Sequence, residues 1–316
     1  MSILSSQTFA KAAQAVIDDF SQASTMYANS LILSIYGDTI CPHGGNIWLG
    51  SLIKLVEPLG INQRLVRTSV FRLSEKKILK AKQIGRRSYY SLTDKGFRQF
   101  SSAAKRIYQG PLQTWDGEWR LVITSLGGLE QEQRETVRKE LFWLGFTHIT
   151  TGVFVHPTID LATVKQMVDE MQLTEHIVML QAKTMDDTHI PIANALIKNC
   201  FNVQAFEPEY QEFYELFHPV LEAVRATHHN LDPRLCFLMR TLLIHKYRRI
   251  LLREPELPQG LINEDSWSWR ARLLMVELYQ TIAKPADEYF TELSETEKGK
   301  FACPTSNYYQ RFAAVS

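Results

Sequence analysis

The amino-acid sequence predicts an α+β protein of several domains. Its 316 residues exceed one ordinary compact domain, and 45% hydrophobic against 22% charged residues supply enough apolar material for several cores. Helical and strand-like periodicities divide the chain into three segments: helices with a basic hairpin, then alternating strands and helices, then helices alone. We place these segments at residues 1–109, 110–206 and 207–316.

The first segment is organised around residues 61–92. In the first half of this stretch, small and apolar residues recur at helical spacing, and Asn62 stands at the N-cap position. The pattern predicts a helix that begins after Asn62 and packs one stripe against a core. The stripe consists of Leu65, Val66, Ser69, Val70 and Leu73.

The opposite face of this helix has the composition of a helix that lies in the major groove of DNA. Arginine binds guanine edges and phosphates, glutamine binds adenine, and threonine contacts a thymine methyl group or a phosphate. The outward-facing residues are Gln63, Arg64, Arg67, Thr68, Phe71, Arg72 and Glu75. The residues expected to contact DNA are Gln63, Arg64, Arg67, Thr68 and Arg72.

The second half of the stretch predicts a basic hairpin. Its sequence alternates in strand fashion around Gly85, which is free to turn, and Arg86 and Arg87 stand at the tip. A recognition helix followed by an arginine-tipped hairpin is typical of a winged helix-turn-helix, so the sequence predicts a DNA-binding protein. We expect the two arginines to meet phosphates or enter a minor groove, and Lys80 and Lys82 to contact the DNA backbone.

The charge distribution favours the same function. Between Gly60 and Arg106 the chain has thirteen Lys and Arg residues against two acidic residues, a net charge of +11. The rest of the chain has 22 basic and 32 acidic residues, a net charge of −10. A solvated surface would mix both signs, whereas a segregated positive block is typical of polyanion binding.

Helices are also predicted at residues 8–20, 30–37, 48–59 and 93–108, the last with Thr93 as its N-cap. The amphipathic helix at 8–20 is a strut on the winged domain, a dimer contact or a loosely held arm, and the strut is the simplest interpretation.

The central segment alternates strands and helices. Strands are predicted at residues 119–126, 152–157 and 176–182, with helices at 130–143 and 161–171 between them. A further helix at 192–200 and a candidate fourth strand at 202–206 complete a pattern that suits a ferredoxin-like α+β domain.

The third segment is predicted to be helical at residues 209–228, 233–252, 267–283 and 285–293, with a proline-rich connector at 253–261. Gly110 and Pro111 interrupt the helical pattern between the first two segments, which predicts a hinge at residues 108–112.

Several classes of protein and site are disfavoured. Cys41, Cys200, Cys236 and Cys303 form no Cys-x-x-Cys pair, which argues against a disulfide framework and a structural zinc site. Nucleophile-elbow, dinucleotide-binding and P-loop motifs are lacking, as are a signal sequence and an apolar run of membrane-spanning length. We therefore expect no catalytic residues, no metal and no cofactor, and a cytoplasmic protein.

Motifs along nearly the whole chain resemble the PaaX family of phenylacetic-acid degradation repressors. They are HGGNIWLGSLIKLVEPLGINQRLVRTSVFRL, IGRRSYYSLTDKG, WDGEWRLV, LLIHKYRRILLREPELP and LYQTIAKPADEYF, in that order. The resemblance implies a repressor of phenylacetate catabolic genes that is released from its operator by phenylacetyl-CoA. It also implies a Cas2-like ferredoxin fold for the central domain and a helical C-terminal domain. We expect a homodimer in which the central and C-terminal domains hold the dimer and sense the CoA thioester.

A CoA thioester needs cations for its phosphates, an aromatic surface for adenine and an apolar slot for the acyl ring. The residues that we expect to meet these needs are His245, Lys246, Tyr247, Arg248, Arg249, Trp267 and Arg272. The simpler interpretations are a buried, hydrogen-bonded histidine and an interdomain salt bridge for the two consecutive arginines.

Two other functions stay open. A Cas2-like fold invites a metal-dependent nuclease, but Ser125, Gly127 and Gly128 stand where the first strand would need a carboxylate. Alternatively, the basic domain is a scaffold that binds an acidic protein partner instead of DNA.

Overall fold

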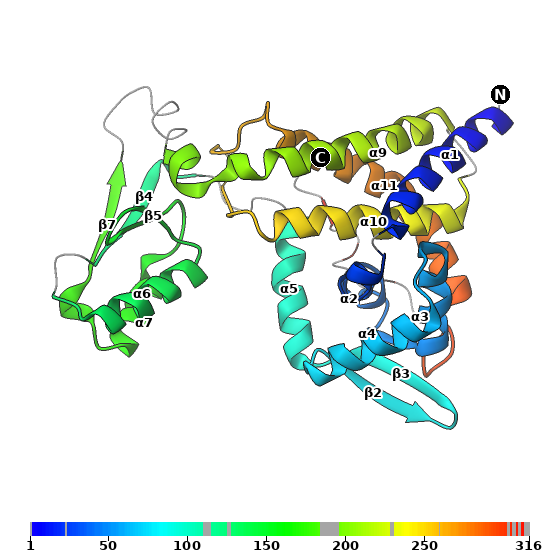
Figure 1. Cartoon of the computed structure of the whole chain (residues 1–316), viewed down its shortest axis with the longest axis horizontal. Coiled ribbons are helices and arrows are strands. Elements are labelled where there is room, and N and C mark those ends of the chain that lie inside the picture. The colour runs from blue at the N-terminus through cyan, green and yellow to red at the C-terminus, as the bar shows by residue number, and fades with distance from the viewer. Residues whose placement is uncertain are drawn as a thin grey trace. The chain divides into compact units, whose positions relative to one another are not determined.

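The computed structural model describes residues 2–22, 24–109, 115–124, 128–183, 196–227, 231–258 and 260–301, together with 304, 308, 311 and 312. These residues belong to two compact units (Figure 1). The first comprises Met1–Gly110, Glu209–Leu252 and Arg270–Ser316, and the second comprises Pro111–Pro208 and Arg253–Trp269. The predicted first and third segments therefore share one unit, except for residues 207–208 and 253–269. The predicted hinge at Gly110 and Pro111 lies outside the described residues.

The N-terminal part of the first unit consists of helices and one small sheet. In chain order its elements are α1 (Ser2–Ser21), α2 (Ser24–Ile35), η1 (Tyr36–Ile40), β1 (Asn46–Trp48), α3 (Leu49–Val56), η2 (Glu57–Leu59), α4 (Gln63–Glu75), β2 (Leu79–Ile84), β3 (Arg87–Leu92) and α5 (Asp94–Tyr108). The strands form an antiparallel sheet in the order β1-β3-β2. Thr93 caps α5 as predicted, because its hydroxyl oxygen accepts from the Gly96 amide at 3.0 Å.

Several predicted boundaries in this part were wrong. The helices expected to begin at residues 8 and 30 begin at Ser2 and Ser24. The helix expected to end at Gly37 continues as the π-helical turn η1, which places Asp38 and Thr39 in the interior. The helix expected to begin at Trp48 begins at Leu49, because residues 46–48 pair with β3 as strand β1. A three-residue strand has too little alternation to be recognised in the sequence.

Helix α10 (Pro233–Leu251) is the centre of the first unit. It contacts α1, α2 and α5 (Figure 1), and twelve of its 19 residues are buried, so it is surrounded by protein on nearly every side. The face predicted for α1, which includes Phe9, Val16 and Phe20, is buried, and α1 packs on α10.

Helices α9 (Glu207–Thr227) and α11 (Trp267–Leu293) complete the helical segment. The sequence predicted a break near Pro285, but α11 runs through this proline. Buried residues on both sides of it, Ile282 and Ala286 among them, hold the helix continuous. Tertiary packing thus outweighs the helix-breaking tendency of one proline.

The second unit is built on a four-stranded antiparallel sheet. Its elements are β4 (Glu118–Ile123), α6 (Gln131–Trp143), β5 (Thr147–Thr150), β6 (Val153–His156), α7 (Leu161–Glu170), η3 (Thr174–His176), β7 (Val178–Lys183), η4 (Ile197–Phe201) and η5 (Val203–Ala205). The strand order is β5-β6-β4-β7. One apolar core, which contains Val137 of α6 and Val164 of α7, adjoins the sheet at Val122 and Phe154. A separate core contains Trp119, Val155 and Phe201.

The predicted strand at residues 202–206 was wrong. Asn202 has a left-handed backbone with φ 50°, and residues 203–205 form a 3-10 turn. The fourth strand of the sheet is β5, four residues for which the sequence predicted no element. Of the helix predicted at 192–200, residues 192–195 lie outside the described residues, and the part from 197 is the π-helical turn η4.

Candidate nucleic-acid interface and adjoining pocket

Helix α4 has the two faces that its sequence predicts. The Asn62 side-chain oxygen accepts from the Leu65 amide at 2.9 Å, which satisfies one of the free donors of the first turn. Val66, Ser69, Val70 and Leu73 are buried, whereas Leu65 is half-buried. This inward stripe fixes the rotation of the helix about its axis, so that its polar side is turned to solvent.

All seven residues predicted to face outward on α4 lie outside the core, and the arginines, Gln63, Thr68 and Phe71 are exposed. Phe71 is 65% exposed. Thr68 donates its hydroxyl proton to the Arg64 carbonyl at 3.0 Å. Its hydroxyl is therefore committed as a donor, which favours contact of its methyl group with a thymine methyl over donation to a phosphate.

Strands β2 and β3 form the predicted hairpin, which extends beside α4 (Figure 1). Ile84 pairs with Arg87, so the turn consists of Gly85 and Arg86 alone. Gly85 has φ 58°, a conformation that glycine adopts without the steric cost other residues incur. Lys80 and Lys82 alternate with Ala81 and therefore project from one face of the ribbon, and both lysines are exposed.

The hairpin is tied to residues 294–299, which we name the acidic strap. Arg87 forms an ion pair with Glu295 at 2.5 Å and lies over the Trp48 ring at 4.4 Å. Lys82 pairs with Glu297 at 2.7 Å. Backbone bonds hold the strap in place, among them the Trp48 amide donating to the Glu295 carbonyl at 2.9 Å.

These ion pairs are partly exposed, so each contributes at most about 1 kcal/mol. In the part of the chain that the structure describes, Arg64, Arg72 and Arg86 form no ion pair. The strap was not predicted from the sequence, because it stands more than 200 residues away from its partners in the chain.

The residues predicted to bind an effector do not form one surface. His245 is fully buried, its Nδ1 lies 3.1 Å from the Ser34 hydroxyl oxygen, and burial lowers the pKa of His245 to about 3. Tyr247 is buried as well. Lys246 pairs with Asp19 of α1 at 2.6 Å. Consecutive helical residues point about 100° apart, which explains the divergence.

The remaining predicted effector residues are also dispersed. The Arg249 guanidinium stacks on the Tyr27 ring at 3.9 Å, and Arg272 is buried in α11. Trp267 belongs to the second unit, where its backbone amide donates to Glu207 at 2.7 Å. Arg248 differs from the other six residues because it lines a cavity.

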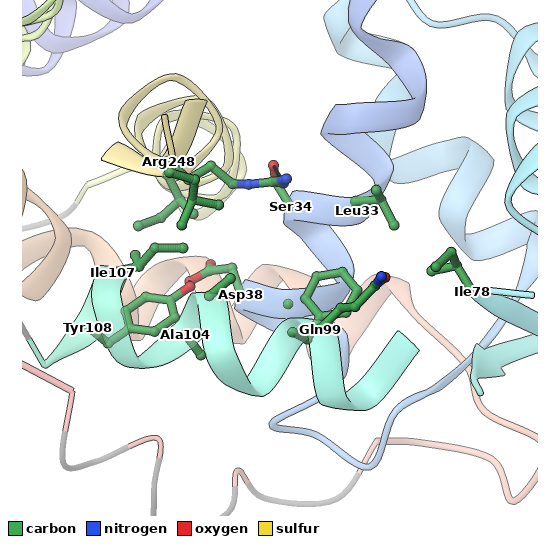
Figure 2. A pocket seen from close by; sticks show the side chains of 14 residues that line it. Leu33, Ser34, Asp38, Ile78, Gln99, Ala104, Ile107, Tyr108 and Arg248 are labelled. Atoms are coloured by element: carbon green, nitrogen blue, oxygen red, sulfur yellow. Dashed lines mark hydrogen bonds between the residues drawn. The ribbon is translucent and has the colours of Figure 1, made fainter. Parts of the chain in front are cut away.

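This cavity, of about 200 Å³, lies between α2, α5 and α10 (Figure 2). Its wall is mostly apolar and consists of Leu33, Ser34, Gly37, Asp38, Ile78, Gln99, Phe100, Ala103, Ala104, Ile107, Tyr108, Ile244, Arg248 and Leu252. Arg248 Nη1 donates to the Ser34 hydroxyl oxygen at 3.0 Å and to the Ser30 carbonyl at 3.4 Å. Burial lowers the pKa of Arg248, because the charged form loses hydration.

Asp38, at one side of the cavity, is already fully engaged. It accepts from Tyr108 at 2.7 Å and from Tyr279 at 3.0 Å, and it pairs with Arg240 and Arg311, each at 3.1 Å. Burial raises the pKa of both tyrosines, which keeps them protonated as donors. Asp38 is therefore unavailable as a partner for Arg248.

Comparison with known proteins matches three consecutive stretches of the chain to family models. Residues 27–96 match the PaaX-like protein family, residues 112–192 match the PaaX protein central Cas2-like domain, and residues 201–292 match the PaaX-like protein C-terminal domain. The chain is also 35% identical over 293 residues to the transcriptional repressor PaaX of Escherichia coli (strain K12), covering 91% of this chain and 90% of that protein. The chain belongs to the PaaX family.

Membership in the PaaX family confirms the prediction of a transcriptional repressor and not an enzyme. The stretch matched to the PaaX-like family contains α4 and the hairpin. The described residues contain no cluster of His, Cys, Asp and Glu suited to a metal ion. Within them, no helix combines the length and apolarity needed to cross a membrane.

The uncharacterized protein Rv0674 from Mycobacterium tuberculosis is a solved structure with a TM-score of 0.47 and 19% identity, covering 76% of this chain and 89% of that one.

Proposed function

We propose that this PaaX-family repressor binds operator DNA as a winged helix-turn-helix protein and controls phenylacetate catabolic genes. The single observation that supports this most is the exposed, carboxylate-poor face of α4 beside an arginine-tipped hairpin, within a segment of net charge +11. Helices α3 and α4 with a tight turn between them, followed by the β2–β3 ribbon, suit this description.

Each predicted contact then has a distinct role. Arg64, Arg67 and Arg72 approach guanine edges or phosphates, and Gln63 approaches adenine. Arg86 and Arg87 meet phosphates or a minor groove, and Lys80 and Lys82 neutralise the backbone. Arg87 and Lys82 must first exchange Glu295 and Glu297 for phosphates.

We propose phenylacetyl-CoA as the effector, with a preference for the conformation that does not bind DNA. An effector shifts an equilibrium only by its difference in affinity for the two states, and operator DNA must weaken effector binding by the same factor. The dispersal of residues 245–249 supports a revised site in which Arg248, and not all five residues, contacts the ligand.

For the rest of the chain we propose three sequence domains at residues 1–109, 110–206 and 207–316, in a cytoplasmic homodimer. The central domain is ferredoxin-like, and the first and third pack into one compact unit. The β-α-β-β-α-β order of the central sheet supports the ferredoxin-like description. Trp143 is 83% exposed, and Phe142 and Ile149 of α6 and β5 are 38% and 42% exposed. A two-fold axis buries such a patch against its own copy.

A mobility shift tests the DNA function. The full-length protein is titrated against its own upstream DNA and a scrambled duplex at two salt concentrations, with phenylacetyl-CoA, free phenylacetate or bare CoA added. We expect a preference for the upstream DNA that survives added salt and is relieved by phenylacetyl-CoA alone. Equal retention of both duplexes would instead indicate a basic scaffold for an acidic partner.

A further inference from the structure

The cavity between α2, α5 and α10 has the size of one aromatic group. Its volume is about 200 Å³, and most of its lining residues are apolar side chains of Leu, Ile, Phe or Ala. An engineered apolar cavity of about 150 Å³ binds benzene, so this one has room for a benzene ring and a few more atoms. A whole CoA ester needs a much larger site, because even drug-sized ligands occupy pockets of roughly 300–1,000 Å³.

The cavity also presents one positive charge that has no anionic partner among the described residues. Arg248 Nη1 is bound to Ser34 and Ser30, whereas Nε and Nη2 form no hydrogen bond with the described part of the chain. Figure 2 shows Arg248 beside Ser34, across the cavity from the α5 side chains Ile107 and Ala104. A desolvated guanidinium without a carboxylate is suited to an oxygen acceptor supplied by a ligand.

We propose that this cavity holds the aryl-acyl end of the effector, with the ring against α5 and the acyl oxygen accepting from Arg248. The inference rests on the proposed function for its choice of a phenylacetyl group. The chemistry by itself asks for a ring-sized apolar group with one oxygen acceptor, which both free phenylacetate and its CoA thioester provide. The nucleotide part of the thioester stays outside the cavity.

The position of the cavity links such a ligand to both DNA-binding elements. Ile78, which directly precedes β2, lines the cavity, and its carbonyl accepts from the Thr93 amide at 2.9 Å, where β3 passes into α5. Leu33 and Ser34 line it from α2, and α2 packs on α4. A bound ring therefore touches the base of the hairpin and the helix behind α4, and it biases the placement of both.

Substitutions that fill the cavity or remove its charge test the proposal. Ala104→Leu fills the cavity, with Ser101→Leu as the control because Ser101 is on α5 but not in the cavity wall. Arg248→Met removes the charge, with Arg234→Met as the control on an exposed turn of α10. Calorimetry measures the dissociation constants of phenylacetyl-CoA, phenylacetate and bare CoA for the wild-type protein and these four variants.

We expect Ala104→Leu and Arg248→Met to weaken phenylacetyl-CoA binding at least tenfold and the two controls to change it less than twofold. Bare CoA should bind equally to every variant. Comparison of phenylacetate with the thioester identifies the source of the phenylacetyl group. A variant that gains binding cannot be explained by misfolding. Leu33→Ala enlarges the cavity and should improve binding of 1-naphthylacetyl-CoA relative to phenylacetyl-CoA at least fivefold.

Two failures are distinguishable. If phenylacetyl-CoA releases the wild-type protein from its operator, but Ala104→Leu, Arg248→Met and Leu33→Ala bind ligands as the wild type does, the cavity is not the site and the proposed function stands. If the wild-type protein neither binds nor responds to phenylacetyl-CoA, the proposed effector is wrong, and this inference falls with it.

Discussion

Two basic regions of the first unit, the outward face of α4 and the C-terminal turns of α10, look alike in sequence and differ in structure. On α4 the cations at 64, 67 and 72 recur at intervals of three and five residues and stand on one exposed face. On α10 the residues from His245 to Arg249 are consecutive, so their side chains point in different directions. Two of them lie in the core, Lys246 forms an ion pair, Arg248 lines the cavity and Arg249 stacks on an aromatic ring. Spacing, and not the number of basic residues, decides whether a helix presents one binding surface.

The comparison predicts that removal of the buried Arg240 of α10 destabilises the fold, whereas removal of an arginine from α4 weakens the proposed DNA binding. Arg240 is fully buried and pairs with Asp38 at 3.1 Å and with Asp287 at 2.6 Å. Arg240→Met leaves both carboxylates without this cation, so we expect the free energy of unfolding to fall by about 3–5 kcal/mol. Urea unfolding followed by circular dichroism measures it. The exposed Arg234→Met on the same helix should change stability by less than about 0.5 kcal/mol.

Arg67→Ala tests the other half of the comparison. We expect a loss of about 1–3 kcal/mol in operator binding, because a bidentate base contact has this magnitude, with little change in stability. Arg249→Ala removes the same charge from α10 and should leave operator affinity unchanged. Gel shifts measure the operator affinity of both variants. An equal loss of affinity in the two would contradict a specific role of α4 in DNA binding.

The pH dependence of stability tests the burial of the basic residues of α10, because a buried histidine resists protonation. The pKa of His245 is lowered to about 3, against 6.5 for an ordinary histidine. The unfolded chain therefore binds more protons below pH 6.5, and stability falls as pH falls from 6.5 toward 3. Between pH 7 and pH 5, His245 should therefore lower the free energy of unfolding by about 2 kcal/mol. His245→Gln should remove that part of the decline, and an unchanged pH profile in urea unfolding would refute the assignment.

The smallest expected effect concerns the acidic strap. Glu295→Gln with Glu297→Gln frees Arg87 and Lys82, and because exposed pairs contribute at most about 1 kcal/mol each, operator binding should tighten only a few-fold. The matched double variant Glu288→Gln with Glu292→Gln removes two charges from α11 and should have less effect. Weaker binding after release of the strap would show that it orients the hairpin instead of competing with DNA.

Sequence patterns correctly predicted the structural features that depend only on residues close together in the chain. Asn62 caps α4, Gly85 turns the hairpin and Thr93 caps α5 because each of these acts within a few residues. The strap, the Asp38 cluster and the cavity could not be predicted, since they join residues up to 273 positions apart. The sequence did contain one signal for the Asp38 cluster. Asp38 follows an apolar helix and Arg240 stands within another, and a charged residue that is buried needs a partner of opposite charge.

The most direct test of DNA binding by α4 and the hairpin replaces Arg64, Arg67, Arg86 and Arg87 by alanine in a folded, full-length sample and measures promoter affinity against salt concentration. We predict that affinity falls on the order of a thousandfold or more and that its salt dependence becomes shallower, by about 0.9 in the logarithmic slope for each phosphate that is no longer neutralised. A control without Arg138, Lys139, Lys165 and Lys198 should bind as the wild type does. Unchanged promoter affinity in the first variant would contradict the assignment of α4 and the hairpin to DNA.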